Sequence, residues 1–395
     1  MNAGGGAAIE TAAFLPLSVP EIRGNELAYL RQCIDSGWVS SAGAFVDRFE
    51  ESVATQVGTR YAVATASGTA ALHTALLVAG VAPEDEVLVS ALTFIAPANA
   101  IRYAGAWPVF IDADPRHGQM DPAKALAFLT GCEHRDGALI NRDTGRRVRA
   151  LLPVHILGHP VDLDPLLDAA REFGLRLIED ATESLGAVYR GRPVGHLGDV
   201  ACFSFNGNKL VTTGGGGMLV TDDPQLAARA RYLTTQAKDD AVEYVHASIG
   251  YNYRLTNIQA AIGVAQMERL TEFLAAKRRI AANYAEGLGS VPGIELMHEA
   301  SWADSAWWMY TVRIDQSEFG IGSRSLMHAL EGRSIQTRPL WQPLHLSPAH
   351  AGSPRSACPV AEEWNRRALS LPCSSGLTEP DQERVITAIR ELARP

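Results

Sequence analysis

Short apolar runs alternate with more polar segments along the first half of the chain. The runs are rich in residues that suit a pleated surface, which favours buried strands, and the segments between them favour helices. Strands are expected at 61–66, 87–91, 108–112, 151–156 and 176–179. Helices are expected at 20–36, 45–56, 67–79, 95–103, 122–129 and 163–173. Strands that alternate with helices predict the α/β class, with a mostly parallel sheet and helices on both faces.

The pattern changes in the second half. A polar run at 133–149 interrupts the alternation and predicts an inserted loop or hairpin. A helix at 224–237 and a loop at 248–257 lead to a helix at 257–288, long enough to bridge two domains. Beyond residue 292 the sequence pattern predicts a smaller α+β domain. Strands are expected at 307–314 and 335–340, and helices at 324–331 and 381–392. The predicted units are a disordered tail at 1–14, a large domain at 15–265 and a small C-terminal domain at 266–395.

The composition is that of an ordinary globular protein. Of the 395 residues, 47% are hydrophobic and 20% are charged, values that are usual for a soluble domain or two. The formal net charge of −9 argues against a nucleic-acid partner. It leaves an anionic small-molecule substrate open, because one or two local arginines are enough to bind one.

Cysteine usage and hydropathy bear on the cellular location. The cysteine count is five, an odd number, and none of them forms a CxxC pair, which favours reduced thiols in a cytoplasmic enzyme. The first fourteen residues have neither a basic region nor a sustained apolar core, so we expect no signal peptide. No run approaches 18 uninterrupted apolar residues, so we expect no membrane-spanning helix.

One lysine, Lys209, stands between an apolar run at 200–205 and four consecutive glycines at 214–217. The apolar run predicts a strand and residues 218–220 predict a second one, so the segment between them is expected to present Lys209 at the end of the sheet. Glycines there allow positive φ and close approach of backbone or ligand. An amine held in this way can condense with an aldehyde, and Lys209 is therefore a candidate for covalent catalysis.

Two other interpretations of Lys209 compete with this one. A solvated lysine in a flexible hairpin is the ordinary case, because lysines are mostly exposed. A P-loop would need G-x-x-x-x-G-K-[ST] at the start of a helix. Since Asn208 precedes Lys209 and Leu210 follows it, the P-loop is excluded.

Several candidate residues directly follow predicted strands: Thr69, Phe94, Asp180 and Lys209. Ligands of such sheets bind beyond the carboxyl ends of the strands, so we expect these residues to form one site. A carboxylate such as Asp180 could pair with a protonated pyridine nitrogen, the pairing that makes pyridoxal phosphate (PLP) an electron sink. Taken alone, Asp180 also suits a turn or helix cap, and Phe94 also suits the core.

A phosphate group could be held at the start of the helix at 67–79. Ser67, Gly68 and Thr69 open this helix, where free N–H groups and the helix dipole favour an anion, and Ser67 is a plausible N-cap. Ser204, a hydroxyl in an otherwise apolar strand, is a second candidate ligand. Each serine alone is also compatible with simple hydrogen bonding to nearby backbone.

Two further pairs of residues have structural interpretations. His155 and His159 are four apart, which is a metal-like spacing only on a helix, and they fall on a strand and the turn after it. We interpret them as structural or substrate-lining and predict no metal. Trp307 and Trp308 are expected in the core of the second domain.

Together these residues resemble the DegT/DnrJ/StrS family of PLP-dependent sugar aminotransferases, which have the fold of aspartate aminotransferase (fold type I). The matching segments are SGTAAL at 67–72, TF at 93–94, EDATESLG at 179–186, SFNGNK at 204–209 and GYNYRLTNIQA at 250–260. They occur in the family's order and cover the chain from about residue 16 to the C-terminus, and as a set they are highly specific. The resemblance implies that the large domain binds PLP.

The resemblance also implies roles for individual residues. Lys209 would be the Schiff-base lysine, Asp180 would pair with the pyridine nitrogen and Phe94 would stack on the ring. The phosphate would be held by Gly68, Thr69 and Ser204. Asn252 would reach the phosphate of the neighbouring subunit, which implies a homodimer with shared active sites.

The substrate is expected to be a nucleotide-linked keto sugar. Glu183, expected near both cofactor and substrate, stands where many family members have glutamine, and this difference resembles a subset acting on UDP-linked N-acetylated 4-keto-6-deoxy sugars. The insertion at 133–149 and the segment IQTRPLW at 335–341 resemble the same subset, which includes enzymes of bacillosamine and legionaminic acid biosynthesis. Further substrate contacts are expected from Trp38, Arg338 and His345, with Arg338 suited to a diphosphate.

The implied reaction is a ping-pong transamination in which L-glutamate becomes 2-oxoglutarate and the amino group passes to C4 of the keto sugar. Such a product would serve bacterial surface-glycan or nonulosonic acid biosynthesis. Alternatives within the class are a GDP-perosamine-type or dTDP-sugar aminotransferase. A related dehydratase branch has histidine in place of the lysine, so Lys209 excludes a dehydratase of that kind. Outside the class, a non-catalytic PLP-binding regulatory protein stays open. A nucleotide-binding oxidoreductase is disfavoured, because no G-x-G-x-x-G follows a strand.

Overall fold

The computed structural model describes residues 13–240 and 242–394, and within them nine strands form one mostly parallel sheet. The sheet has the order β1-β11-β10-β7-β6-β2-β3, and β5 and β4 continue from β6. The strands of this order are β1 Tyr61–Thr65, β2 Glu86–Ser90, β3 Trp107–Ile111, β6 Arg147–Leu152, β7 Arg176–Asp180, β10 Val200–Ser204 and β11 Gly217–Thr221. From β10 to β3 all neighbours are parallel, whereas β11 pairs antiparallel with both β10 and β1. The predicted α/β class with its mostly parallel sheet is confirmed.

Helices pack on both faces of this sheet. They are α1 Glu26–Ser36, α2 Ala44–Val57, α3 Gly68–Val78, α4 Ala96–Tyr103, α5 Pro122–Gly131, α6 Asp164–Phe173, α7 Pro224–Thr234, α8 Asn257–Met267, α9 Leu270–Leu288, α10 Gln316–Phe319, α11 Ser323–Glu331, α12 Pro359–Arg367 and α13 Glu379–Leu392. Successive side chains of a strand point to opposite faces. Val87 and Val89 accordingly join one apolar cluster with α3 and α4, while Leu88 joins a second cluster with α2, α5 and α6.

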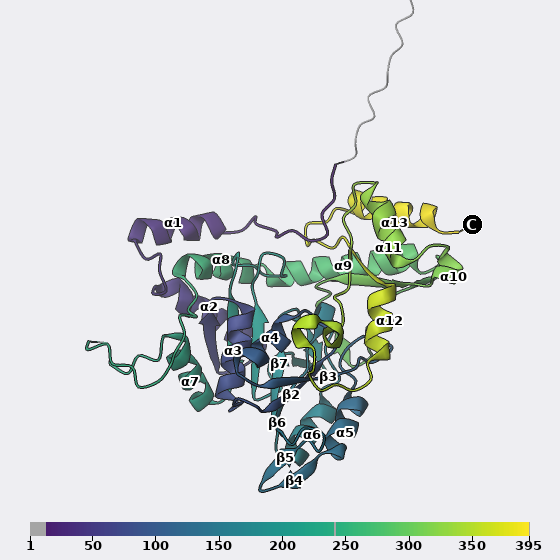
Figure 1. Cartoon of the computed structure of the whole chain (residues 1–395). Helices are drawn as coiled ribbons and strands as arrows, with labels where there is room; N and C mark the ends of the chain where they lie inside the picture. The colour runs from purple at the N-terminus through teal and green to yellow at the C-terminus, as the bar shows by residue number, and fades with distance from the viewer. Residues whose placement is uncertain (1–12, 241, 395) are drawn as a thin grey trace, which may run out of the picture.

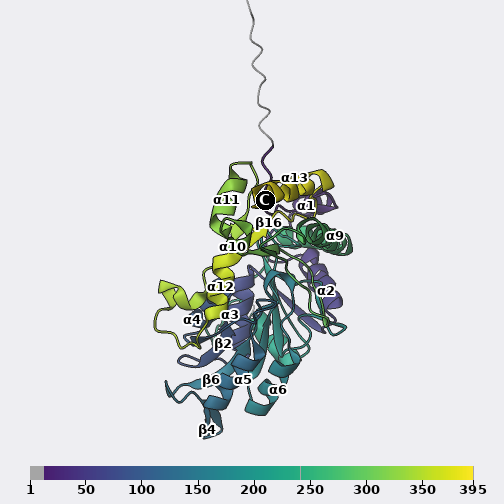
Figure 2. The same cartoon turned by 90° about the vertical axis from the view of Figure 1, so that its right-hand side faces the viewer.

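The polar insertion predicted as a loop or hairpin forms a hairpin of β4 Glu133–Arg135 and β5 Ala138–Ile140. It lies with α5 and α6 at the end of the molecule opposite α11 and α13 (Figure 2). The next strand differs from the predicted 151–156, because β6 begins at Arg147 and ends at Leu152. Pro153 follows, and a proline cannot donate a hydrogen bond within a central strand.

The helix predicted at 257–288 is two helices, α8 and α9, which follow one another along one side of the large sheet (Figure 1). The break falls at Arg269, whose N–H bonds to Gln266 three residues back instead of four. The predicted helix at 20–36 is also shorter, since α1 begins at Glu26. The Glu26 carboxylate accepts hydrogen bonds from Gly24 N–H and from the side chain of Gln266, and this fixes a turn before the helix.

A second, antiparallel sheet lies in the C-terminal part. Its order is β12-β14-β16-β15, with β12 Ile294–Glu295, β14 Tyr310–Ile314, β16 Ala368–Leu371 and β15 Arg338–Pro339. A third small sheet joins β13 Ala303–Asp304, β8 Val188–Tyr189 and β9 Arg192–Pro193. The strand predicted at 307–314 begins only at Tyr310, because Trp307 has φ 49°, a left-handed conformation that ends an extended strand. The predicted helix at 224–237 stops at Thr234 for the same reason, with φ 67° at Gln236.

The first described residues pack on the C-terminal part. Leu15 pairs with Ile335 in a parallel bridge, and the N–H of Leu17 donates to the Gln336 side chain. The predicted boundary at residue 265 falls inside α8. The division into two domains therefore stays a prediction, and most of the predicted tail lies outside the described residues.

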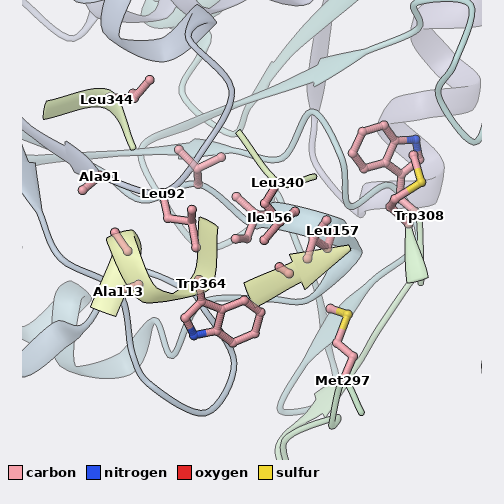
Figure 3. Packing of buried hydrophobic residues seen from close by; sticks show 14 of the residues in the cluster. Ala91, Leu92, Ala113, Ile156, Leu157, Met297, Trp308, Leu340, Leu344 and Trp364 are labelled. Carbon is pink, nitrogen blue, oxygen red and sulfur yellow. The ribbon is translucent and has the colours of Figure 1, made fainter. Parts of the chain in front are cut away.

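One apolar cluster joins the large sheet to the C-terminal part. Figure 3 shows side chains that follow β2 and β6, Leu92, Ile156 and Leu157, in the same cluster as Leu340 and Trp308. All five residues are less than a tenth exposed. This shared core holds the C-terminal part against the carboxyl end of the sheet. No helix of the described residues is long and apolar enough to span a membrane.

Two glycines allow the start of α3 to lie directly on the sheet. A Cβ on Gly68 would lie 2.8 Å from Ser204 Cβ, and a Cβ on Gly217 would lie 2.4 Å from the Ser67 carbonyl oxygen. Real Cβ atoms do not approach other atoms this closely, so a side chain at either position would push the helix away. The N-terminus of α3 is thereby fixed beside the end of β10 and the start of β11.

We expect Gly217→Ala to destabilise the protein by about 1–3 kcal/mol, because the new methyl group overpacks the contact with Ser67. Urea denaturation of the variant and the wild type measures the difference. Gly131→Ala is the matched control, since nothing lies within 4 Å of a Cβ added at Gly131. Equal stability of Gly217→Ala and wild type would contradict the close approach.

Candidate active site

A pocket of about 310 Å³ lies where α3 begins and where β7 and β10 end. Its position at the carboxyl ends of parallel strands is the usual one for ligand sites in α/β sheets. The residues that line it are Ser67, Gly68, Thr69, Leu72, Thr93, Phe94, Ala96, Pro97, Asp180, Thr182, Glu183, Ser204, Asn206, Asn208, Lys209, Gly215, Gly216, Trp308 and Trp341.

Lys209 reaches this pocket from the loop after β10. Its Nζ lies 3.5 Å from Glu183 Oε1 and 4.1 Å from the centre of the Trp308 ring. The glycine turn beyond Lys209 is fixed at Gly215, whose carbonyl oxygen accepts hydrogen bonds from Thr213 Oγ1 and Gln259 Nε2, each at 2.6 Å. The lysine therefore points into a defined pocket and is not a solvated side chain of a flexible hairpin.

Asp180 and Glu183 place two carboxyl groups in the same pocket. Asp180 ends β7, is 1% exposed and accepts a hydrogen bond from Thr182 N–H at 3.1 Å. Burial raises the pKa of Asp180, and the nearby Lys209 ammonium opposes that rise in pKa only in part. Burial likewise raises the pKa of Glu183, against the attraction of Lys209. Both carboxyl groups therefore lie where a nearby positive charge or a proton is favourable.

Glu183 is held by a strained turn. Its Oε2 accepts a hydrogen bond from Leu157 N–H at 2.8 Å. Leu157 has φ 61°, a left-handed conformation that is rare for a branched residue. Strain of this kind persists only where the surroundings fix it and is common at functional sites. The strained turn aims the Glu183 carboxyl at Lys209.

The two histidines singled out by their spacing form protein hydrogen bonds. His155 Nδ1 accepts from Val161 N–H, and its Nε2 lies 3.2 Å from Glu179 Oε2. Burial acts to raise the pKa of Glu179, but hydrogen bonds from His155 and main-chain N–H groups outweigh it and lower the pKa. His159 Nε2 accepts from Ala300 N–H. Both histidines thus have structural roles.

The start of α3 forms a cup that suits an anion. Ser67 caps the helix by accepting a hydrogen bond from Ala70 N–H, and Gly68, Thr69 and Ser204 line the pocket beside it. Free N–H groups at a helix start bind phosphate well. Phe94, in the loop between β2 and α4, is 53% exposed and offers an aromatic face to the pocket.

The pocket brings together seven residues proposed from the sequence: Gly68, Thr69, Phe94, Asp180, Glu183, Ser204 and Lys209. Four others do not line it. Asn252 and Trp38 are exposed, and Arg338 is exposed on β15. His345 is buried, with its Nε2 2.9 Å from Glu362 Oε1. The functional roles of all eleven residues stay predictions.

Sequence reasoning missed two tryptophans, Trp308 and Trp341. Trp308 was expected only in the core; it is 5% exposed, but its indole also lines the pocket and donates to the Asn208 carbonyl oxygen at 2.8 Å. Nothing in the sequence near Trp308 indicates that it meets a loop 100 residues earlier. Trp341 lies in the segment 335–341 from which only Arg338 was singled out.

The comparison with protein families decides the identity of this fold and site. The model of the DegT/DnrJ/EryC1/StrS aminotransferase family matches residues 20–390. The chain belongs to this aminotransferase family. The resemblance seen in the sequence motifs is thereby confirmed.

Relatives of this DegT-family chain act on different nucleotide sugars. A GDP-perosamine synthase of Caulobacter vibrioides is 41% identical over 96% of this chain and 98% of its own length. A dTDP-3-amino-3,4,6-trideoxy-alpha-D-glucose transaminase of Streptomyces venezuelae is 37% identical over 96% of this chain and 95% of its own length. The crystal structure of S. venezuelae DesV in complex with a ketimine intermediate covers 94% of this chain and 95% of its own, with a TM-score of 0.84 and 36% identity.

The DegT-family chain is therefore a PLP-dependent nucleotide-sugar aminotransferase of fold type I. The residues present fit the cofactor. Lys209 would supply an amine, Asp180 a buried carboxylate for the ring nitrogen, Phe94 an aromatic surface, and the start of α3 an anion cup. A buried carboxyl with a raised pKa is stabilised as the anion by a cationic ring nitrogen.

We expect Asp180→Asn to stabilise the cofactor-free protein at neutral pH. Because the folded-state pKa of Asp180 is raised, the favourable contribution of this carboxyl is present below its unfolded pKa and is lost as pH rises through its folded pKa. The variant should be more stable than wild type near pH 8, and the difference should shrink as pH falls through the folded pKa toward the ordinary aspartate value of 3.8. Urea denaturation across this range measures it.

Asp168→Asn is the control, since the Asp168 side chain is 72% exposed, and it should change stability little at any pH. A wild type that is more stable than Asp180→Asn near pH 8 would contradict the burial argument.

Proposed function

We propose that this chain transfers an amino group from L-glutamate to the C4 keto group of a GDP-linked 4-keto-6-deoxy sugar. The observation that carries the proposal is the convergence of Lys209, Asp180 and Glu183 beside an anion cup, in a chain 41% identical to a protein named GDP-perosamine synthase. The relative named for a dTDP sugar makes dTDP the second candidate nucleotide. The UDP-linked sugar expected from Glu183 and the insertion has less support from these relatives than either.

The residues that line the pocket have separate roles in the proposed reaction. PLP, when bound, supplies an electron sink that stabilises negative charge at the carbon bearing the amino group. Lys209 Nζ would attach the cofactor and, when free, would move a proton as general acid and base. Asp180 would keep the ring nitrogen of the cofactor protonated. Glu183, 3.5 Å from Lys209 Nζ, is placed to exchange a proton with it.

The surrounding side chains orient the reacting groups. Gly68, Thr69 and Ser204 would hold the phosphate of the cofactor. Phe94 would supply an aromatic surface for its ring. Trp308 lies against Lys209 Nζ and covers one side of it. Holding reacting groups in one geometry contributes much of the rate enhancement in enzymes.

We further propose that the protein works as a homodimer in the cytoplasm. Asn252 is exposed and lies next to the segment 242–250, which projects beyond α7 (Figure 1). This segment exposes large apolar side chains: Val242, Tyr244, Val245 and Ile249. Exposed apolar groups of this kind favour an interface. The five cysteines are free and buried, which suits a reducing compartment.

The first test is the visible absorbance of the purified protein before and after L-glutamate. We expect a yellow band that gives way to a shorter-wavelength form, and we expect Lys209→Ala to have no turnover, because no amine replaces Lys209. The glutamate-treated enzyme is then supplied with GDP-, dTDP- and UDP-linked 4-keto-6-deoxy sugars. Mass spectrometry of the product should show amination of the GDP sugar with the highest kcat/KM.

Three outcomes would contradict parts of this proposal. A protein that stays colourless with added PLP would favour a non-catalytic role. Substantial turnover by Lys209→Ala would refute the role of this lysine. A preference for the UDP sugar would restore the expectation drawn from Glu183 and overturn the choice of nucleotide.

Shared active sites predict that two inactive variants complement each other. Lys209→Ala lacks the amine, and Asn252→Asp places a negative charge against the phosphate of the neighbouring subunit. A mixed dimer then contains one intact site, formed by Lys209 of one subunit and Asn252 of the other. After the two variants are unfolded and refolded together, about a quarter of the wild-type activity should return.

Each variant refolded alone is the control and should stay inactive. No recovery on mixing, with dimers present by light scattering, would show that Asn252 acts within its own subunit or not at all.

A further inference from the structure

A buried lysine outside the pocket, Lys277 on α9, is not used by the reaction described above. It is 3% exposed, and within residues 13–240 and 242–394 no carboxylate lies within ion-pair distance of its Nζ. Burial lowers the pKa of Lys277. A buried lysine without an opposite charge is costly, so its remaining contacts matter.

Those contacts are two main-chain oxygens and the Cys373 thiol, which itself donates to the Trp308 carbonyl oxygen. Lys277 Nζ donates to the Trp308 carbonyl oxygen at 2.8 Å and also to the Cys373 carbonyl oxygen. The residue before Trp308, Trp307, has φ 49°. The backbone therefore enters Trp308 from a left-handed conformation, which needs support from its surroundings. Lys277 supplies that support from a rigid helix.

Trp308 links Lys277 to the pocket. Its indole N–H donates to the Asn208 carbonyl oxygen at 2.8 Å, and its ring lies 4.1 Å from Lys209 Nζ. A single residue thus joins the Lys277 ammonium to Lys209. A shift of the Trp308 backbone would move both the wall beside Lys209 and the loop that holds it.

We propose that Lys277 is a positioning residue of the aminotransferase, which fixes the Trp308 main chain and through the indole holds Lys209 in its reactive place. The proposal rests on the role of Lys209 proposed above. It adds a residue that touches neither cofactor nor substrate and lies on the far side of the pocket wall.

A neighbour on the same helix offers a matched control. Tyr284, two turns further along α9, is fully buried, and its Oη donates to the Pro372 carbonyl oxygen at 2.7 Å. Tyr284→Phe therefore removes a buried hydrogen bond from α9 to the same 372–373 turn that Lys277 contacts. The Tyr284 hydroxyl makes no hydrogen bond to Trp308, so its loss should leave Lys209 in place.

The experiment measures attachment of PLP to the cofactor-free protein, as well as turnover. The Lys209 amine condenses with the PLP aldehyde and releases water, and borohydride reduces the resulting C=N bond, so that mass spectrometry of peptides counts modified Lys209. Lys277→Met should slow attachment and lower kcat about ten-fold or more, with the KM for the keto sugar within about two-fold. Lys277→Gln, whose neutral amide group can still donate hydrogen bonds, should fall between this variant and wild type.

The remaining variants separate positioning from stability. Tyr284→Phe should lower Tm but leave attachment and kcat at wild-type values. In a Trp308→Phe background, Lys277→Met should cause no further slowing, because the indole that transmits the effect is gone.

Wild-type rates in Lys277→Met, or an equal loss in Tyr284→Phe, would overturn the proposal while leaving the role of Lys209 intact. A wild-type protein that fails to attach PLP at Lys209 would overturn both. Rejection of every keto sugar would refute only the proposed substrate, since attachment is measured without it.

Discussion

The charge balance among Asp180, Glu183 and Lys209 governs the pocket. Burial raises the pKa of both carboxyl groups, and the Lys209 ammonium, 3.5 Å from Glu183, offsets their charge only in part. A cationic ring nitrogen beside Asp180 would complete this balance, and a phosphate at the start of α3 would meet the positive end of a helix. The cofactor would therefore supply charges of the sign that each part of the pocket favours. Function and stability oppose each other here, as is common at active sites.

The fold brings these groups together from distant parts of the chain. Asp180 ends β7, Lys209 follows β10, and the phosphate cup opens α3, so the parallel sheet gathers them at one edge. Gly68 and Gly217 let the helix lie directly on the strands. The C-terminal part adds Trp308 as a wall. The pocket therefore depends on the shared core that holds the two parts of the molecule together.

Much of this arrangement could be predicted from local patterns. Neighbouring residues alone predict the strand ends at Asp180 and near Lys209, and they also predict the capped helix start at Ser67. Trp308 could not be found in this way, because its meeting with Asn208 joins segments 100 residues apart. The break at Arg269 depends on tertiary contacts too, because Glu268 beside it binds Asn25 and Tyr29 of the N-terminal part. The nucleotide of the substrate is selected by a few side chains of the pocket, and the patterns that predict the fold carry no information about them.

The bridge between Leu15 and Ile335 has a consequence for how the protein is made. A ribosome releases the N-terminal strand segment long before its partner exists, since Leu17 and Gln336 are 319 residues apart. The large sheet can pair its own strands during synthesis, whereas this segment must wait for nearly the whole chain. Closing such a long loop is among the slower steps of folding. We therefore expect the pairing of Leu15 with Ile335 to be among the last contacts to form.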